Sequence, residues 1–332
     1  MEFALVVGGG QVQHDRHGLE VIVEEAQLAE SLGYDVVFVP DHYVHEQLGV
    51  FLKDQPVYEM FFALATLAQH TKRIKLGSHV ACTLFRHPAM LARLFSQLDE
   101  ASGGRVIAGV GAGWTKAEFD MLGIEFPPIS ERLAMMDEAV TVVRGLWGEE
   151  PFSFEGKYYT LTDAMIRPRP LQDPGPPLMI GGSGNGILRR AGQWADIIHM
   201  VPQTGAAGTT TIENVAKFTD ATVTEKLNRV RDESEKAGRG RDAVTYATTI
   251  FNYLPTPSPA ATKKRAEGMA GVFGLTAEEY LCHPSVLAGT PEEMCDELRR
   301  RHELHGLDLV AVAFGSAEQV SGFADGVMPG LS

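Results

Sequence analysis

The 332-residue sequence predicts an α/β fold, a closed (β/α)8 TIM barrel with insertions. One unit recurs along the chain: an amphipathic stretch, a glycine and a short apolar run. The apolar runs do not alternate with polar residues, which is typical of strands covered on both faces of a parallel sheet. Eight such runs occur without a break in composition, whereas an open sheet of this kind usually stops at about six strands. We therefore expect one barrel domain over residues 1–332.

Each predicted strand follows a helical pattern or a turn signal. The first predicted helix covers residues 18–32, has Gly33 as its C-cap, and has an apolar face made of Leu19, Ile22, Ala26, Ala29 and Leu32. Similar patterns at 88–104, 187–195 and 291–306 precede later strands. The expected strands are the apolar runs within 3–7, 35–42, 73–81, 105–114, 177–182, 196–201, 244–251 and 307–314.

Two segments do not fit the repeating unit and are interpreted as insertions. In the first, near 150–176, the stretch FSFEGKYYTL predicts a hairpin that turns at Glu155-Gly156. The Pro-rich RPRPLQDPGPP that follows is expected to be extended. The second insertion lies near 254–287.

Composition limits the classes of partner. The chain has 29 Lys and Arg against 43 Asp and Glu, so its net charge of −14 disfavours nucleic acid and anionic membranes. No stretch approaches the roughly 20 apolar residues of a membrane span. Cys82, Cys282 and Cys295 are far apart, which gives neither a disulfide framework nor a zinc cluster. These features predict a cytoplasmic protein that binds a small molecule.

Active sites of such barrels lie at the carboxyl ends of the strands, and Asp41 and His42 follow the second strand. An imidazole beside a carboxylate could exchange a proton with a substrate. The alternative is a loop histidine in solvent. The nearby His45 suggests a metal, but the other strand ends lack matching ligands, so no metal site is expected.

Glycines follow the fourth and fifth strands, in GVGAGW and GGSGNG. The small residues Ala108, Gly109, Gly111, Ala112 and Gly113 would let a flat or bulky group approach the backbone. Exposed amides at 182–184, ahead of a helix, would form an anion site suited to phosphate. The alternative is a pair of tight barrel turns. Trp114 is a candidate wall of a substrate pocket.

Four parts of the chain are distinctive: FRHPAMLARLFSQLDEASGGRVIAGVGAGW, VPDH, RPRPLQ with PPLMIGGSG, and GTPEEMCDELRRRHELHGLDLV. Together they resemble the luciferase-like monooxygenase superfamily, and within it the branch that uses the deazaflavin coenzyme F420. The resemblance covers about nine-tenths of the chain in a consistent order. It implies a barrel of the bacterial-luciferase type and a homodimer. It also implies a cofactor site made of His79, Val80, Ala112, Gly113, Gly181, Gly182, Ser183 and Gly184, with the cofactor's phosphate on the last three.

The resemblance implies further details of the site. A non-proline cis peptide is expected between His79 and Val80, forming a bulge behind the cofactor's tricycle, and His42 is expected on the substrate side of the ring. Sugar-phosphate dehydrogenases of this branch have a glutamate where this chain has Trp114, so a hexose phosphate is not the expected substrate. Substrate choice is expected to reside in residues 8–18 and 254–287.

The resulting functional prediction is hydride transfer between F420 and a small organic substrate. In this prediction His42 donates or accepts the proton, Asp41 holds its tautomer, and Trp114 and Met200 line the substrate pocket. His14, His17 and His79 are the other candidate proton carriers. The alternatives are an FMN-dependent luciferase-like monooxygenase, a flavin- or deazaflavin-binding protein without catalysis, and a metal-dependent barrel hydrolase.

Overall fold

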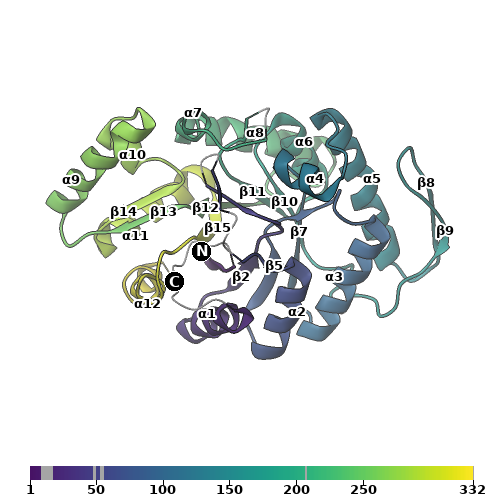
Figure 1. Ribbon diagram of the computed structural model, residues 1–332. Helices are drawn as coiled ribbons and strands as arrows, with labels where there is room; N and C mark the ends of the chain where they lie inside the picture. Colours follow the sequence, from purple (N-terminus) through teal and green to yellow (C-terminus); the bar gives the residue numbers. More distant parts are fainter. Residues whose placement is uncertain (9–17, 48–49, 53–55, 206–207, 332) are drawn as a thin grey trace.

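The computed structural model describes residues 1–8, 18–47, 50–52, 56–205 and 208–331. Its centre is a closed barrel of parallel strands surrounded by helices, as predicted (Figure 1). Closure comes from the pairing of β10 with β7. In barrel order the strands are β1 (Glu2–Val6), β2 (Val36–Val39), β5 (Lys75–Ser78), β7 (Val106–Gly111), β10 (Leu178–Gly181), β11 (Ile197–Met200), β12 (Thr245–Ile250) and β15 (Leu307–Val312). The two-residue strand β6 (Ala81–Cys82) continues β5 and also pairs with β7.

The outer layer consists of helices that begin and end at the expected signals. Gly33 caps α1 in the left-handed conformation, with φ of 86°, as predicted. Thr290 and Glu293 form a capping box at the start of α11. The longer helices are α1 (Leu19–Leu32), α2 (Met60–His70), α3 (Pro88–Ser102), α5 (Ile129–Trp147), α6 (Asn185–Trp194), α8 (Asp220–Lys236), α11 (Pro291–His305) and α12 (Ala317–Gly326). Two short helices, α4 (Lys116–Leu122) and α7 (Ile212–Ala216), lie near the barrel mouth.

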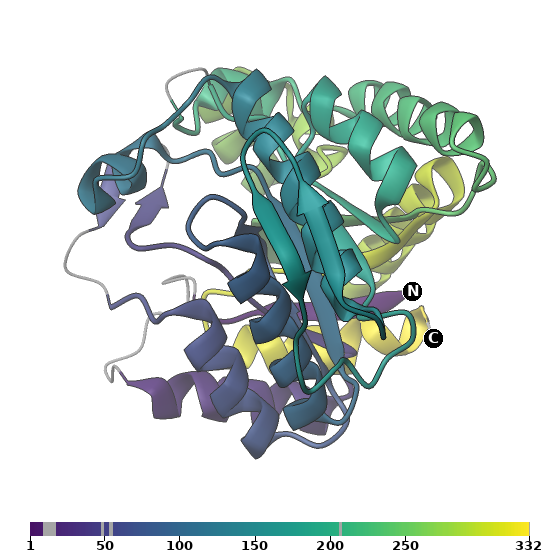
Figure 2. The ribbon, with the colours of Figure 1, turned by 90° about the vertical axis from the view of Figure 1, so that its right-hand side faces the viewer.

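Both predicted insertions contain secondary structure of their own. The predicted hairpin is confirmed as antiparallel β8 (Phe152–Glu155) and β9 (Thr160–Ala164), and it lies along one side of the barrel (Figures 1 and 2). The second insertion lies beyond β12 on the opposite side in Figure 1. It comprises β13 (Asn252–Pro255), α9 (Pro259–Ala270), the 3-10 helix η1 (Gly271–Phe273), α10 (Ala277–Leu281) and β14 (Val286–Gly289). The remaining elements are the antiparallel pair β3 (His45–Gln47) and β4 (Val50–Leu52) and the 3-10 helix η2 (Met328–Gly330).

The apolar runs are unbroken because each strand is buried on both faces. One cluster fills the barrel interior, with Phe38, Ile107 and Met179 among its members. A larger cluster lies between the strands and the helices and includes their sequence neighbours Val37, Ala108 and Ile180. Within the described residues, no helix combines the length and apolar character of a bilayer span.

Strands β5 and β7 approach each other closely at Gly109. The Ser78 hydroxyl donates to the Gly109 carbonyl at 2.7 Å. A Cβ added at Gly109 would lie 2.0 Å from the backbone oxygen of Ser78, so only glycine fits there. This close approach brings the bulge after β5 against β7.

The Gly109→Ala variant tests this close approach. We expect it to lower the free energy of unfolding by about 2 to 4 kcal/mol, because the opposing carbonyl is fixed in the sheet. The control is Gly268→Ala in α9, where a Cβ meets nothing within 4 Å and stability should stay equal or rise. Urea unfolding measures both variants, and equal stabilities would contradict the packing argument.

Candidate functional site

His42 follows β2, and its ring contacts a carboxylate from a distant part of the chain. Its Nδ1 lies 3.0 Å from Oε1 of Glu118, on α4, and 3.2 Å from Oε2. The Glu118 side chain is 3% exposed and that of His42 is 26% exposed. Because a carboxylate accepts, Nδ1 carries the hydrogen. Glu118 is a site residue that the sequence analysis missed.

The prediction that Asp41 holds the His42 tautomer is wrong. Asp41 instead accepts two hydrogen bonds from the Arg86 guanidinium, at 2.7 and 2.8 Å, and one from the Cys82 amide at 2.9 Å. Successive side chains at a strand end point to opposite faces, so neighbours in sequence need not meet. Asp41 therefore fixes the segment after β6, and Glu118 fixes the His42 ring.

Of the two predicted pocket walls, only Trp114 lies beside His42. Their rings meet edge to face, with centroids 5.6 Å apart, and Trp114 is half-buried. Met200, in contrast, is fully buried in the cluster between strands and helices, so the prediction that it lines the pocket is wrong. Strand alternation turns its neighbour His199 toward the barrel interior instead.

The predicted cis peptide between His79 and Val80 is present and forms the expected bulge. The Val80 side chain fills the space that three glycines leave open. A Cβ at Gly111 or Gly181 would lie 2.8 Å from Val80, and one at Gly109 would lie 3.0 Å from it. The bare backbone of β7 therefore accommodates Val80, a side chain of this chain, where the sequence suggested an external group.

His79, His199 and Thr249 form a polar cluster below the bulge, in which His199 and Thr249 are buried and His79 is half-buried. The two Nε2 atoms are 3.1 Å apart, and the Thr249 hydroxyl lies 3.0 Å from Nε2 of His199. The Phe38 ring stacks on His79, with centroids 5.0 Å apart. Burial lowers the pKa of His79 to about 4, and the nearby His42 contributes to this decrease. Burial also lowers the pKa of His199 well below its usual value. Both rings are therefore neutral at neutral pH.

The predicted anion cradle follows β10. Gly182 has φ of 124°, a conformation that favours glycine, and its amide donates to the His199 carbonyl. The Ser183 hydroxyl donates to the Val201 carbonyl at 2.7 Å, so Ser183 offers its amide. Gly184 begins α6 without a side-chain cap, and a Cβ there would approach only Gln203, at 3.9 Å. An uncapped helix start with room above it fits a phosphate.

Two other predicted cofactor residues face protein. Ala112 packs in the cluster between strands and helices. Gly113 has φ of 71°, and a Cβ there would lie 2.8 Å from the Cys82 sulfur and from the Phe119 ring. Any contact of Ala112 or Gly113 with a cofactor would therefore come from the backbone.

Some candidates lie outside the described residues, namely His14, His17 and most of the loop 8–18. The side chain of His45 is also outside them. Among the side chains that are described, no three His, Cys, Asp or Glu residues are arranged to hold a metal ion.

Comparison with known proteins adds the family. The family model described as luciferase-like monooxygenase matches residues 1–308. The chain belongs to this family. An F420-dependent glucose-6-phosphate dehydrogenase of Microbacterium testaceum is 32% identical over 278 residues, which are 82% of this chain and 75% of the relative.

Two solved structures of similar fold also name F420. An F420-dependent secondary alcohol dehydrogenase, in complex with an F420-acetone adduct, has a TM-score of 0.78 at 22% identity. The comparison covers 100% of this chain and 99% of that one. The F420-dependent tetrahydromethanopterin reductase of Methanopyrus kandleri has a TM-score of 0.74 at 21% identity, with coverages of 100% and 99%.

In this luciferase-like chain, the neutral histidine pair predicts a loss of stability in acid. The pKa of His79 is about 4 when folded and its ordinary value is 6.5, so below pH 6.5 the unfolded chain binds protons that the folded chain does not. The free energy of unfolding should therefore fall by about 3 to 4 kcal/mol between pH 7 and pH 5 through His79 and His199 together. Urea unfolding at both pH values measures this decrease. In a double variant, His79→Asn with His199→Asn, the free energy of unfolding should decrease less between these pH values. A decrease as large as that of the parent would show that the two histidines do not cause it.

Proposed function

We propose that this protein is an oxidoreductase that transfers a hydride between coenzyme F420 and a small organic substrate. The observation that carries the proposal is the His42–Glu118 pair, which lies at the same end of the barrel as the open cradle at Gly184. The names of the relatives support the choice of coenzyme.

The residues present fit a phosphate-bearing tricyclic cofactor. The amides of Ser183 and Gly184 and the start of α6 would hold its phosphate. Val80, on its bulge, would contact the tricycle from the barrel side. When bound, F420 would supply or take up the hydride, which is the part of the reaction that side chains cannot perform.

The proton would be handled by His42. Glu118 accepts from Nδ1, so Nε2 is the atom that gives or takes the proton, and the carboxylate stabilises the imidazolium. The Trp114 and His42 rings pack edge to face, and Trp114 would help to exclude water from this proton exchange.

The substrate is proposed to be an alcohol, an imine or an activated alkene. The redox state of the coenzyme would determine whether this substrate is oxidised or reduced. The relative from Microbacterium testaceum is named for glucose 6-phosphate. Trp114 occupies the position at which such enzymes are expected to have a glutamate, so we propose that glucose 6-phosphate is not turned over here.

We also propose that the protein is cytoplasmic and forms a homodimer. Light scattering of the purified protein would measure its oligomeric state.

A second candidate is an FMN-dependent monooxygenase, because the cradle at Gly184 would hold the phosphate of FMN equally well. A third candidate, a protein that binds the cofactor without catalysis, would make the same contacts with the cofactor. Titration of the purified apo-protein with F420 and with FMN, followed by cofactor fluorescence, separates the two cofactors. Tight binding of FMN alone would overturn the F420 proposal, and turnover of a screened substrate excludes a role in binding only.

Gly184→Val tests the cradle. Gly184 has φ of −76° and ψ of 150°, which any residue adopts, so the fold should be retained while the new side chain occupies the phosphate position. We expect cofactor affinity to fall about tenfold or more, with an unchanged melting temperature. Gly182 is the poorer choice, because its φ of 124° would strain any side chain. A folded Gly184→Val protein with the parent affinity would remove the cradle from the site.

His42→Ala and Glu118→Gln test the proton step. We expect His42→Ala to slow turnover by roughly 10²–10⁴-fold while cofactor affinity stays near that of the parent. Glu118→Gln keeps an acceptor for Nδ1 but removes the charge, so it should slow turnover by about tenfold and displace the pH profile of kcat. Asp41→Asn, which weakens the Arg86 contact, is the control that should alter stability without displacing that profile. Turnover by His42→Ala within about twofold of the parent would exclude His42 from the mechanism.

A further inference from the structure

A cavity lies beside the cradle, at the carboxyl end of β11. Its volume is about 430 Å³, and it is formed by the segment after β11 together with α7 and α8. Gln203, Asn214, Lys217, Phe218, Thr222 and Lys226 are among the residues that line it. Gln203 separates the cavity from the cradle, because its Nε2 is 3.9 Å from the position of a Cβ on Gly184.

The charged side chains that line this cavity are both lysines. Lys217 is exposed and pairs with Glu213 one turn earlier on α7, at 2.6 Å. Lys226 is half-buried, and its Nζ lies 5.7 Å from the centroid of the Phe218 ring. Burial lowers the pKa of Lys226, and Glu225 opposes this effect. Among the described residues, no carboxylate lies within ion-pair distance of Lys226, in a chain whose net charge is −14.

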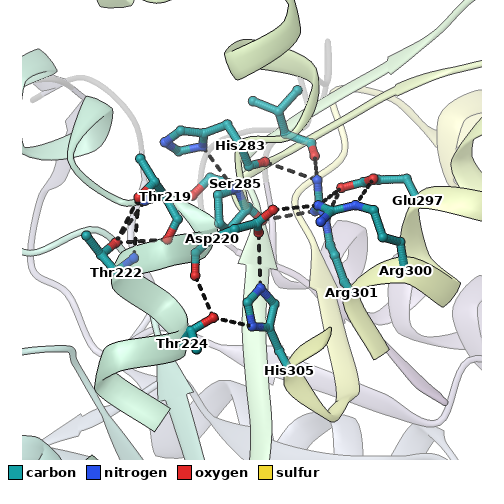
Figure 3. A network of polar contacts seen from close by, with 12 residues as sticks. Thr219, Asp220, Thr222, Thr224, His283, Ser285, Glu297, Arg300, Arg301 and His305 are labelled. Atoms are coloured by element: carbon teal, nitrogen blue, oxygen red, sulfur yellow. Dashed lines mark hydrogen bonds and ion pairs between the residues drawn. The ribbon is translucent and has the colours of Figure 1, made fainter. Parts of the chain in front are cut away.

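The start of α8, which carries Thr222 and Lys226, is rigidly anchored (Figure 3). Asp220, the first residue of α8, accepts from Arg300 at 2.7 Å and from His305 at 3.1 Å, both on α11. Burial alone would raise the pKa of Asp220, but these hydrogen bonds lower it below its usual value. Thr219 and Thr222 complete a capping box. The ammonium of Lys226 is therefore presented on a fixed helix.

Helix α7, whose C-cap is Lys217, is tied to the same network. The His283 ring accepts the Ser285 amide at Nδ1 (Figure 3). Its Nε2 therefore donates to the Val215 carbonyl at 2.8 Å. Arg301 in turn donates to the carbonyls of His283 and Val286. The contacts from α11 thus hold both sides of the cavity without using either lysine.

We propose that this lysine cavity binds a carboxylate or phosphate group of a ligand whose other part lies at the cradle. This inference rests on the proposed function, because the ligand is either the coenzyme or its substrate. F420 carries glutamate residues beyond its phosphate, and these acidic groups would extend from Gly184 past Gln203 to Lys226. An acidic substrate is the other source of the same chemistry. Ammonium groups that are partly removed from water bind such anions through charge-assisted hydrogen bonds.

The test uses a double variant, Lys217→Met with Lys226→Met, in the full-length protein. Lys236→Met, at the far end of α8, is the matched control. A second control changes both cavity lysines to Arg, which keeps their charge and should preserve the binding of glutamylated F420. Fluorescence titrations compare F420 with several glutamates, F420 without glutamate, and the deazaflavin alcohol that lacks the phosphate. The double Met variant should bind glutamylated F420 about tenfold more weakly, as expected for lost charge-assisted hydrogen bonds, and should bind the other two as the parent does.

A second measurement separates the two sources of the anion. Inorganic phosphate is added during thermal unfolding of the parent, the double Met variant and Gly184→Val. Unchanged coenzyme affinities, together with a phosphate-dependent stabilisation that is lost only in the double Met variant, would assign the cavity to an anionic substrate. Unchanged coenzyme affinities and unchanged stabilisation would overturn the inference. If the parent binds no form of F420, the proposed function fails, and the phosphate measurement still decides whether the cavity binds anions.

Discussion

The carboxylate of Glu118 connects the parts of the barrel mouth on which the proposed site depends. It accepts from Nδ1 of His42 and from the backbone amides of Tyr43 and Val44, so it joins the segment after β2 to α4. Its own position is fixed because the next residue, Phe119, is fully buried against Phe126. A buried carboxylate with three donors is satisfied without water, and it fixes the hydrogen of the His42 ring on Nδ1.

The second constraint is the contact between the Val80 side chain and the glycines of β7 and β10. Three positions on two strands lack a Cβ, and a single valine occupies the space that results. The bulge is therefore held by the packing of the barrel, which is rigid, and its position does not depend on a ligand. Such a surface is preorganised, since the elements that would contact a cofactor are set by contacts made during folding.

The barrel could be predicted from the sequence because its signal is repeated in every strand and helix. The cis peptide after His79 could be predicted because the resemblance supplied it. The phosphate cradle at Gly182–Gly184 was expected from neighbouring residues in sequence, and it stays a prediction. Glu118 was missed because it lies 76 residues from His42 and belongs to no motif. Asp41 and Met200 were misassigned because their sequence position was considered without the alternation of strand side chains, which turns His199 inward and Met200 outward.

The two kinds of histidine at the barrel mouth explain how one site can hold a proton at a defined atom. His79 and His199 are kept neutral by burial, and they satisfy one another and Thr249. His42, in contrast, is partly exposed and has a carboxylate partner. A charge on His79 would oppose an imidazolium at His42, because the two groups interact electrostatically. In the proposed reaction, the neutrality of the buried pair would therefore favour an imidazolium at His42, and different surroundings would give the same side chain two different roles.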